Sequence, residues 1–385
     1  MNNFPTDFKP ISQDSRIHAI DALRGFALLG VLLANLPVSD NPVTTLTIDE
    51  PMGLLYYLFI EKKFMTIFSI LFGFGFYIQM KRAEKKDINF NKYFLKRMVL
   101  LFAIGTVHAW LFWNGDILRA YALGGILLLL LRKSSIKKML AGALVSIILL
   151  TGILFIVNSA LGWRYGFGYE YALEIFTATS FVKYLEINFI TDPWVNFLID
   201  MPLTIAFAFG NMLLGVVLGR IGFFEMSKET QKLRSWLVVL GITLGVGASF
   251  VYFMVVTGKL ELDIPLLWLP FVVVAGMLAQ SLSYIALFVW LYSKNQSKRL
   301  LNFFKPVGHT ALTNYLMQSL FMIIIFYHCT NLFSYYGQFG TTMTFATGTV
   351  IFILQSIISR IWLERFDQGP IEQLWRRWSY GQQTK

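Results

Sequence analysis

The sequence predicts an all-α integral membrane protein, a polytopic helical bundle of about ten transmembrane helices. Only 14% of its 385 residues are charged and 56% are hydrophobic, whereas about 25% of the residues in a soluble domain are charged. Its apolar runs approach the roughly 20 residues that a helix needs to cross the hydrocarbon core, and they lack the alternation of barrel strands. The runs cover residues 22–38, 64–80, 96–113, 117–131, 138–159, 197–219, 235–257, 266–292, 310–333 and 342–363.

The distribution of Lys and Arg predicts that the N- and C-termini both lie in the cytoplasm. Basic residues are retained on the cytoplasmic side of a membrane, and most of the 33 Lys and Arg residues fall in the two terminal segments and in alternate loops. We therefore expect a single membrane domain over residues 1–385, located in the bacterial cytoplasmic (inner) membrane. The transmembrane bundle would occupy residues 22–363.

Three segments outside these runs are predicted to lie at the membrane interface. Residues 52–60 are apolar but too short to cross, so we expect an interfacial or re-entrant piece before the second span. The tail, 364–385, is predicted to be cytoplasmic and interfacial. The long outer connection, 158–196, is rich in aromatic residues, which favour the interface. These aromatic residues are Trp163, Tyr165, Phe167, Tyr169 and Tyr171.

Charge and cysteine content exclude several classes of function. The net charge of +11 follows from the topology, so we do not expect nucleic acid as a partner. The single cysteine, Cys329, rules out an intrachain disulfide. Four dispersed histidines and one apolar cysteine have no metal-ligand spacing, so no metal is expected. A phosphate-binding P-loop is also missing from the sequence, which argues against coupling to ATP.

Polar residues inside apolar runs are costly to bury, and they therefore indicate candidate functional positions. The first group opens the first run, where Asp21 and Arg24 are three residues apart and share a helix face. In the structural interpretation, Asp21 interacts with the helix dipole and Arg24 anchors the helix at the inner membrane surface. In the functional interpretation, Arg24 contacts an anion at the cytoplasmic mouth of a site. Asn35 lies about 16 Å further along the helix, near the outer face.

The second group, Glu61-Lys62-Lys63, precedes the second run at its outer entrance. These charges are either a solvated interfacial cluster or contacts to a substrate, in which case Glu61 and Lys63 are the candidates.

The third group lies in a predicted tight hairpin between the third and fourth runs. It contains His108, Asn114, Asp116, Arg119 and Tyr121. In the structural interpretation Asp116 caps the following helix and pairs with Arg119. In the functional interpretation His108 is a general base that a neighbouring carboxylate orients, which makes it the best catalytic candidate.

The fourth group enters the ninth run and contains His309, Thr313, Asn314, Tyr315 and Gln318. One or two such residues are explained by hydrogen bonds between helices, but this density favours a polar cavity. Arg24, His309 and Thr313 are expected near the cytoplasmic side and Gln318 at about mid-membrane. The residues expected near the outer side are Asn35, Glu61, Lys63, His108, Asp116 and Arg119. Together they predict a polar passage through the bundle.

These polar groups belong to longer strings that resemble the YeiB-like bacterial membrane proteins, a family defined as a domain of unknown function. The strings are DALRGFALLGVLLAN at 21–35, KFMTIFSILFGFGF at 63–76, HAWLFWNGDILRAYAL at 108–123, GHTALTNYLMQS at 308–319 and GPIEQLWRRWSYG at 369–381. They span nearly the whole chain.

That family is distantly similar to transmembrane acyltransferases, which move an acyl group from cytoplasmic acyl-CoA to an acceptor outside. In those enzymes a basic residue in the first helix precedes a catalytic His by eleven positions. Arg24 matches the basic position, but Asn35 stands where the His would be, and an amide cannot act as a general base. Either His108 has taken over that task, or the scaffold has kept its passage and lost the chemistry.

The resemblance and the polar residues together predict an acyltransferase-like protein with acyl-CoA as co-substrate. Arg24 would bind its phosphates, beside His309, Thr313 and Asn314 at the inner mouth. His108 would take the acceptor's proton while Asp116 orients it. Asn35 and Asn114 would stabilise the oxyanion. The expected substrate contacts are Glu61, Lys63, Asn114, Arg119, Tyr121, Tyr315 and Gln318.

Two other functions remain open from the sequence. The same passage would suit a transporter or exporter of a small organic anion, and a non-catalytic membrane scaffold would also account for the helices. The expected partners are the lipid bilayer, an acyl donor, a small-molecule or glycan acceptor, and a second copy of the chain in a homodimer.

Overall fold

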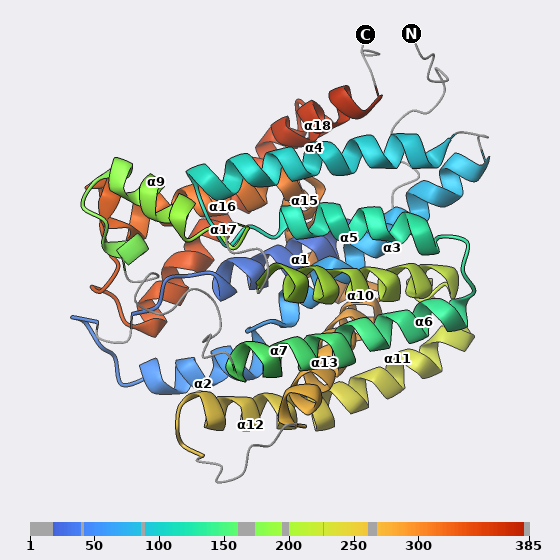
Figure 1. Ribbon diagram of the computed structural model, residues 1–385, viewed down its shortest axis with the longest axis horizontal. Helices are drawn as coiled ribbons and strands as arrows, with labels where there is room; N and C mark the ends of the chain where they lie inside the picture. Colours follow the sequence, from blue (N-terminus) through green and yellow to red (C-terminus); the bar gives the residue numbers. More distant parts are fainter. Residues whose placement is uncertain are drawn as a thin grey trace.

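The computed structural model describes residues 18–39, 42–85, 89–160, 174–194, 200–225, 227–260 and 268–380. In these residues the chain forms helices, several of which, including α4, α5, α10 and α11, run roughly along the long axis of the molecule (Figure 1). Outside the helices, the described part contains one isolated β-bridge, between Thr44 and Phe339. The structure therefore confirms the predicted all-α polytopic helical bundle.

Each of the ten predicted runs coincides with a helix or with consecutive helices. These are α1 (His18–Ala34), α3 (Lys63–Lys85), α4 (Phe90–Leu111), α5 (Leu118–Leu131), α6 (Ile136–Leu144) with α7 (Thr151–Ala160), α10 (Asp200–Arg220), α11 (Lys228–Leu240) with α12 (Val246–Val256), α13 (Leu269–Tyr292), α16 (Ala311–Phe326) and α17 (Thr341–Leu363). Two π-helical turns, η2 (Val145–Leu150) and η3 (Gly241–Gly245), make α6–α7 and α11–α12 continuous.

By length and composition, seven of the described helices can cross a membrane, or eight if the bent pair that ends in α16 counts as one span. Helices α1 and α5 have only 17 and 14 residues, fewer than the roughly 20 needed for a full crossing. The difference from ten therefore lies in these two short helices, which pack inside the bundle.

Short helices complete the described chain. They are α2 (Asp49–Phe59), α9 (Phe181–Ile190), α14 (Asn295–Leu301), η4 (Asn302–Phe304), α15 (Lys305–His309), η5 (His328–Thr330) and α18 (Pro370–Tyr380). The apolar segment 52–60 thus belongs to α2, and the chain turns into α3 through Lys62, whose φ of 62° is unusual for a lysine. The aromatic residues expected at 163–171 lie outside the described residues.

Basic loops gather at one end of the bundle, called here the basic end. The guanidinium of Arg220 at the end of α10 donates to the carbonyls of Arg132 and Ser134 in the α5–α6 turn. The indole of Trp375 in α18 donates to the carbonyl of Arg97 near the start of α4. Helices α2 and α9 lie at the opposite, distal end (Figure 1). This alternation agrees with the predicted sidedness, and the placement of both termini in the cytoplasm stays a prediction.

Helices α1 and α15 cross at backbone contact because two glycines face each other's backbone. A Cβ atom added at Gly308 would lie 1.7 Å from the carbonyl oxygen of Asp21, and one added at Gly25 would lie 1.9 Å from that of Phe304. The chain then bends by 83° between residues 295–309 and α16. This crossing fixes the position at which α16 enters the bundle.

Replacing Gly308 with alanine is therefore expected to destabilise the bundle by at least about 1–3 kcal/mol, the typical cost of overpacking. A methyl group at this position can be accommodated only if two backbones move apart. Thermal unfolding in detergent measures the effect, with Gly53→Ala as the control, because a Cβ at Gly53 meets nothing within 4 Å. Equal unfolding temperatures for the two variants would contradict the crossing.

Candidate functional site

A buried chain of three side chains joins the α4–α5 hairpin to α16. Nδ1 of His108 lies 2.8 Å from Oδ2 of Asp116, and Nε2 of His108 lies 2.9 Å from Oγ of Ser319. His108 is 2% exposed, Asp116 3% and Ser319 4%. We call these three residues the relay.

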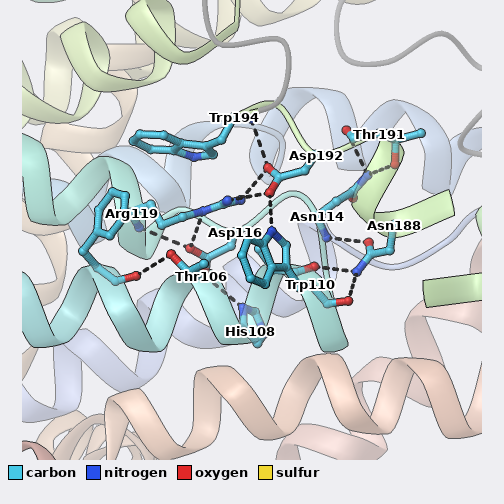
Figure 2. Close-up of polar contacts among 12 residues, drawn as sticks. Thr106, His108, Trp110, Asn114, Asp116, Arg119, Asn188, Thr191, Asp192 and Trp194 are labelled. Atoms are coloured by element: carbon cyan, nitrogen blue, oxygen red, sulfur yellow. Dashed lines mark hydrogen bonds and ion pairs between the residues drawn. The ribbon is translucent and has the colours of Figure 1, made fainter. Parts of the chain in front are cut away.

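The local fold explains how the hairpin forms the His108–Asp116 pair. Helix α4 ends at Leu111 and α5 begins at Leu118, so the short turn returns Asp116 alongside the last turn of α4. Oδ1 of Asp116 accepts the backbone N–H of Arg119 at 3.2 Å, while Oδ2 contacts His108 (Figure 2). Asp116 therefore contacts both the first turn of α5 and the ring of His108, and its part in catalysis stays a prediction.

The relay has the order of groups found in hydrolytic triads: hydroxyl, imidazole, carboxylate. A carboxylate can only accept a hydrogen bond, so Nδ1 of His108 carries the proton. In the neutral imidazole Nε2 is then the acceptor, and the hydroxyl of Ser319 donates to it. In this tautomer His108 is able to take a proton from a hydroxyl group at Nε2.

Arg119 is held by a second carboxylate rather than left free for a substrate. Its guanidinium makes a bidentate ion pair with Asp192, at 2.7 and 2.9 Å, and stacks over Trp194, 5.3 Å from the ring centroid. Asp192 also accepts from the indole of Trp110 at 3.0 Å. Figure 2 shows Arg119 between Asp192 and Asp116, so this buried pair holds the segment after α9 against the hairpin.

Asn114 is likewise engaged with α9. Its side-chain amide donates to the hydroxyl of Thr191 at 2.7 Å, and its backbone N–H donates to the side chain of Asn188 at 2.9 Å. Tyr184 of α9 donates to the carbonyl of Phe112, and burial raises the pKa of Tyr184, so its phenol stays a donor. In Figure 2 the amide of Asn114 is directed toward α9. This arrangement assigns Asn114 a structural contact.

A cavity of about 640 Å³ opens among α1, α3, α4, α5, α16 and α18, within the range of small-molecule sites, about 300–1,000 Å³. The cationic side chains in its lining lie toward the basic end, together with the carboxylates of Glu372 and of Asp21, which pairs with Arg24 at 3.2 Å. The cationic residues are Arg24, Arg82, Lys85, Arg97, His309 and Arg376. The opposite part of the lining is apolar or aromatic. It includes Phe68, Leu71, Phe72, Met98, Leu101, Leu118, Tyr121 and Tyr315.

The cavity is elongated along the bundle. On α3 its lining extends from Lys85 to Phe68, which is about 25 Å at the rise of an α-helix. Leu118, at the start of α5, also lines it and lies at the other end of the bundle from Lys85. The cavity therefore runs from the charged helix ends into the bundle interior.

The deep end of the cavity meets the relay at Tyr315. The ring of Tyr315 lies 5.2 Å from that of His108, centroid to centroid, and its phenol accepts the N–H of Ile117 at 3.4 Å. Leu312, Tyr315 and Ser319 share one face of α16, because they are spaced by three and four residues. Ser319 is therefore the next position along the face that lines the cavity.

Three predicted residues of α16 do not line the cavity and instead contact neighbouring helices. The hydroxyl of Thr313 donates to Glu372 of α18 at 2.5 Å, the amide of Asn314 donates to Ser359 of α17 at 2.9 Å, and that of Gln318 donates to the carbonyl of Leu28 in α1 at 3.2 Å. Hydrogen bonds between helices therefore account for these three residues. This was the alternative to a polar cavity that the sequence left open.

The remaining candidates lie at the distal end. The ammonium group of Lys63 is buried and donates to the carbonyl of Tyr57, and Glu61 accepts from the hydroxyl of Tyr252 at 3.3 Å. Asn35 directly follows α1. In the described part of the chain no hydrogen bond links its side chain to the relay. The structure thus brings together His108, Asp116, Tyr121, Tyr315, Arg24 and His309 around the cavity and the relay.

Several important residues were not predicted from the sequence. Ser319 is the last residue of the fourth string, and its spacing from Tyr315 was the available signal. Asp192 is 73 positions from its partner Arg119, and no local pattern indicates that pair. Arg97 lines the cavity, but in the sequence it is one of many basic residues near a loop and nothing sets it apart.

Comparisons with known proteins place the chain in a family. A family described as a protein of unknown function (DUF418) matches residues 218–382. YxaH of Bacillus subtilis (strain 168) is 32% identical over 97% of both chains. The chain belongs to the YeiB-like family. YeiB of Escherichia coli (strain K12) is 26% identical over 93% of this chain and 94% of its own length.

A further relative, described as a 39.9 kDa protein in the amylase 3′ region of Bacillus acidopullulyticus, is 28% identical over 96% of both chains. No solved structure matches the chain. The DUF418 match includes Ser319 but begins after His108 and Asp116. The names of the YeiB-like relatives state no reaction, so the function has to be inferred from the cavity and the relay.

Proposed function

We propose that this YeiB-like protein is a membrane acyltransferase that takes an acyl group from acyl-CoA and passes it to an acceptor from the distal side. One observation carries the proposal: a single elongated cavity has cationic side chains at one end and an apolar end that abuts His108 through Tyr315. Acyl-CoA carries its phosphates far from its reactive thioester, so its distribution of charge matches that of the cavity.

The cationic end offers several groups suited to phosphate. Arginine binds phosphate through parallel N–H groups, and Arg24, Arg82, Arg97 and Arg376 all line this end. Arg97 carries the most specific signal. Its guanidinium stacks on Trp375, 3.8 Å from the ring centroid, while its buried Nε has no hydrogen-bond partner among the described residues. A buried N–H is normally paired, so an anionic ligand at Arg97 would satisfy it.

The relay supplies the acid–base chemistry that Asn35 cannot. The hydroxyl or amine of an acceptor loses its proton to Nε2 of His108, and Asp116 stabilises the resulting imidazolium. The thioester carbonyl is attacked, its C–S bond breaks, and the departing thiolate of CoA takes the proton from the imidazolium. The proposal thus assigns to His108 the task that a first-helix His has in the resembling acyltransferases.

Binding of coenzyme A to the detergent-purified protein, measured by calorimetry, tests this function. Loss of hydrogen bonds to a charged group costs about 1.5–3 kcal/mol, so we expect Arg97→Ala to weaken binding by about 10- to 150-fold. Arg24→Ala is expected to act in the same direction. Lys228→Ala is the control, because Lys228 is an exposed cation at the basic end outside this cavity. A folded wild-type protein that does not bind coenzyme A would refute the proposal.

A transporter of a small organic anion is the second candidate, favoured by the 83° bend before α16. Broken helices often form the substrate site of secondary transporters, and the bend lies beside His309 and Gly308 of the cavity. Uptake by vesicles in the absence of any acyl donor would identify a transporter. Transfer of label from acyl-CoA without net movement of the donor would identify an acyltransferase.

A further inference from the structure

We propose that Ser319 is the nucleophile of the reaction and carries the acyl group as an ester between two half-reactions. The inference rests on the proposed acyltransferase function and adds to it a covalent intermediate and an assigned atom. Its basis is the 2.9 Å hydrogen bond between Oγ of Ser319 and Nε2 of His108, in a relay that Asp116 completes.

The hydrogen-bond partner of Ser319 is an imidazole, whereas Ser146 and Ser356 bond to backbone carbonyls of other elements and Ser249 bonds to a side-chain amide. A serine inside a helix commonly donates to the carbonyl four residues earlier, as Ser69 and Ser281 do here. Among the described residues the side chain of Ser319 instead pairs with an imidazole 211 positions away. An imidazole whose other nitrogen is held by a carboxylate raises the nucleophilicity of such a hydroxyl.

The position of Ser319 also suits a carrier. It follows Tyr315 on the face of α16 that lines the cavity, so an acyl group delivered along the cavity would reach it after a movement of the Tyr315 ring. The relay residues are at most 4% exposed, which leaves little room for a donor and an acceptor at the same time. An ester on Ser319 would hold the acyl group while coenzyme A leaves and the acceptor arrives.

The two half-reactions balance with groups that are present. In the first, Oγ of Ser319 attacks the thioester carbonyl and its proton moves to Nε2 of His108. The C–S bond breaks, the imidazolium returns the proton to the thiolate, and free coenzyme A leaves. In the second, an acceptor hydroxyl or amine gives its proton to His108 and attacks the ester. The bond between the acyl carbon and Oγ of Ser319 breaks, and Oγ regains the proton from His108.

The first half-reaction requires no acceptor, and this makes it directly measurable. Purified protein is mixed with radiolabelled acetyl-CoA, quenched in acid and digested, and the peptides are analysed by mass spectrometry while released coenzyme A is counted. We expect a burst of about one coenzyme A per protein and an acetyl group on Ser319. Ser319→Ala should bind coenzyme A as the wild type does but show neither burst nor label.

Two further variants separate chemistry from folding. Ser319→Cys keeps a nucleophile of similar size and is expected to retain the acetyl group as a thioester, which neutral hydroxylamine releases. Ser283→Ala is the matched control, because Ser283 is also buried but bonds within its own helix, to the carbonyl of Gln280. It should be labelled like the wild type.

Three results would contradict part or all of this proposal. Coenzyme A binding without burst or label would overturn the role of Ser319 and leave direct transfer to the acceptor as the mechanism. Label in Ser319→Ala equal to that in the wild type would do the same. Failure of the wild type to bind coenzyme A would instead overturn the acyltransferase proposal itself, and the acyl-Ser319 intermediate with it.

Discussion

Replacing His108 with glutamine is expected to lower the rate of acyl transfer by about 10²–10⁴-fold, the typical contribution of a general base. Glutamine is nearly as large as histidine and can still form hydrogen bonds to Asp116 and Ser319, but it cannot take up a proton at neutral pH. Binding of coenzyme A should be unchanged, because the cationic lining of the cavity is untouched. The measurement is the release of free coenzyme A from acetyl-CoA.

Two companion variants make this prediction specific. Asp116→Asn should slow transfer comparably, because an amide in place of the carboxylate favours the wrong tautomer of His108. His328→Gln is the control, since His328 lies in η5 and contacts the carbonyl of Tyr336, away from the relay. If His108→Gln turned over at the wild-type rate, the relay would have no part in the reaction.

Replacing Arg119 with methionine is expected to destabilise the protein by about 3–5 kcal/mol, the cost of breaking a buried ion pair by removing one partner. Asp192 is 1% exposed and would remain as an uncompensated buried charge. The indole of Trp110 and the backbone N–H of Trp194 both bond to it, so the segment after α9 should loosen as well. The unfolding midpoint in detergent, by heat or denaturant, measures the loss.

An exposed pair provides the comparison. Lys183 and Glu186 of α9 lie 3.1 Å apart with side chains 54% and 55% exposed, and an exposed pair contributes only about 0–1 kcal/mol. Lys183→Met should therefore barely change the midpoint. Removing both charges, in Arg119→Met with Asp192→Leu, should recover part of the loss. An Arg119→Met variant as stable as Lys183→Met would show that the Arg119–Asp192 pair does not hold the hairpin.

The sequence predicted the features that depend on near neighbours in the chain. The apolar runs indicated the helices because each helix spans a contiguous stretch that has to be apolar throughout. His108 and Asp116 could be paired because only eight positions and a tight hairpin separate them. Arg24 could be placed at the mouth of a site because a charge at the end of a span lies near the end of the bundle.

Features that depend on tertiary packing could not be predicted in this way. Ser319 contacts His108 because of where α16 lies in the bundle, and the α1–α15 crossing fixes that position. Neither the apolar pattern nor the spacing of polar residues predicts this contact. The polar density around Asn314 and Gln318 indicated a cavity, but neighbouring helices satisfy these amides. Sequence shows that buried polar groups require partners, but it does not show which helix provides them.

The central claim is that the acyl group of acyl-CoA reaches His108 through the cavity. Photo-crosslinking with a coenzyme A thioester that carries a diazirine at the end of its acyl chain tests it most directly, with mass spectrometry to locate the labelled residue. We expect labels at Tyr315, Tyr121 or Leu118, which should be lost in the presence of excess coenzyme A. Labels confined to the outer surface of α11 and α12, with no competition by coenzyme A, would contradict it.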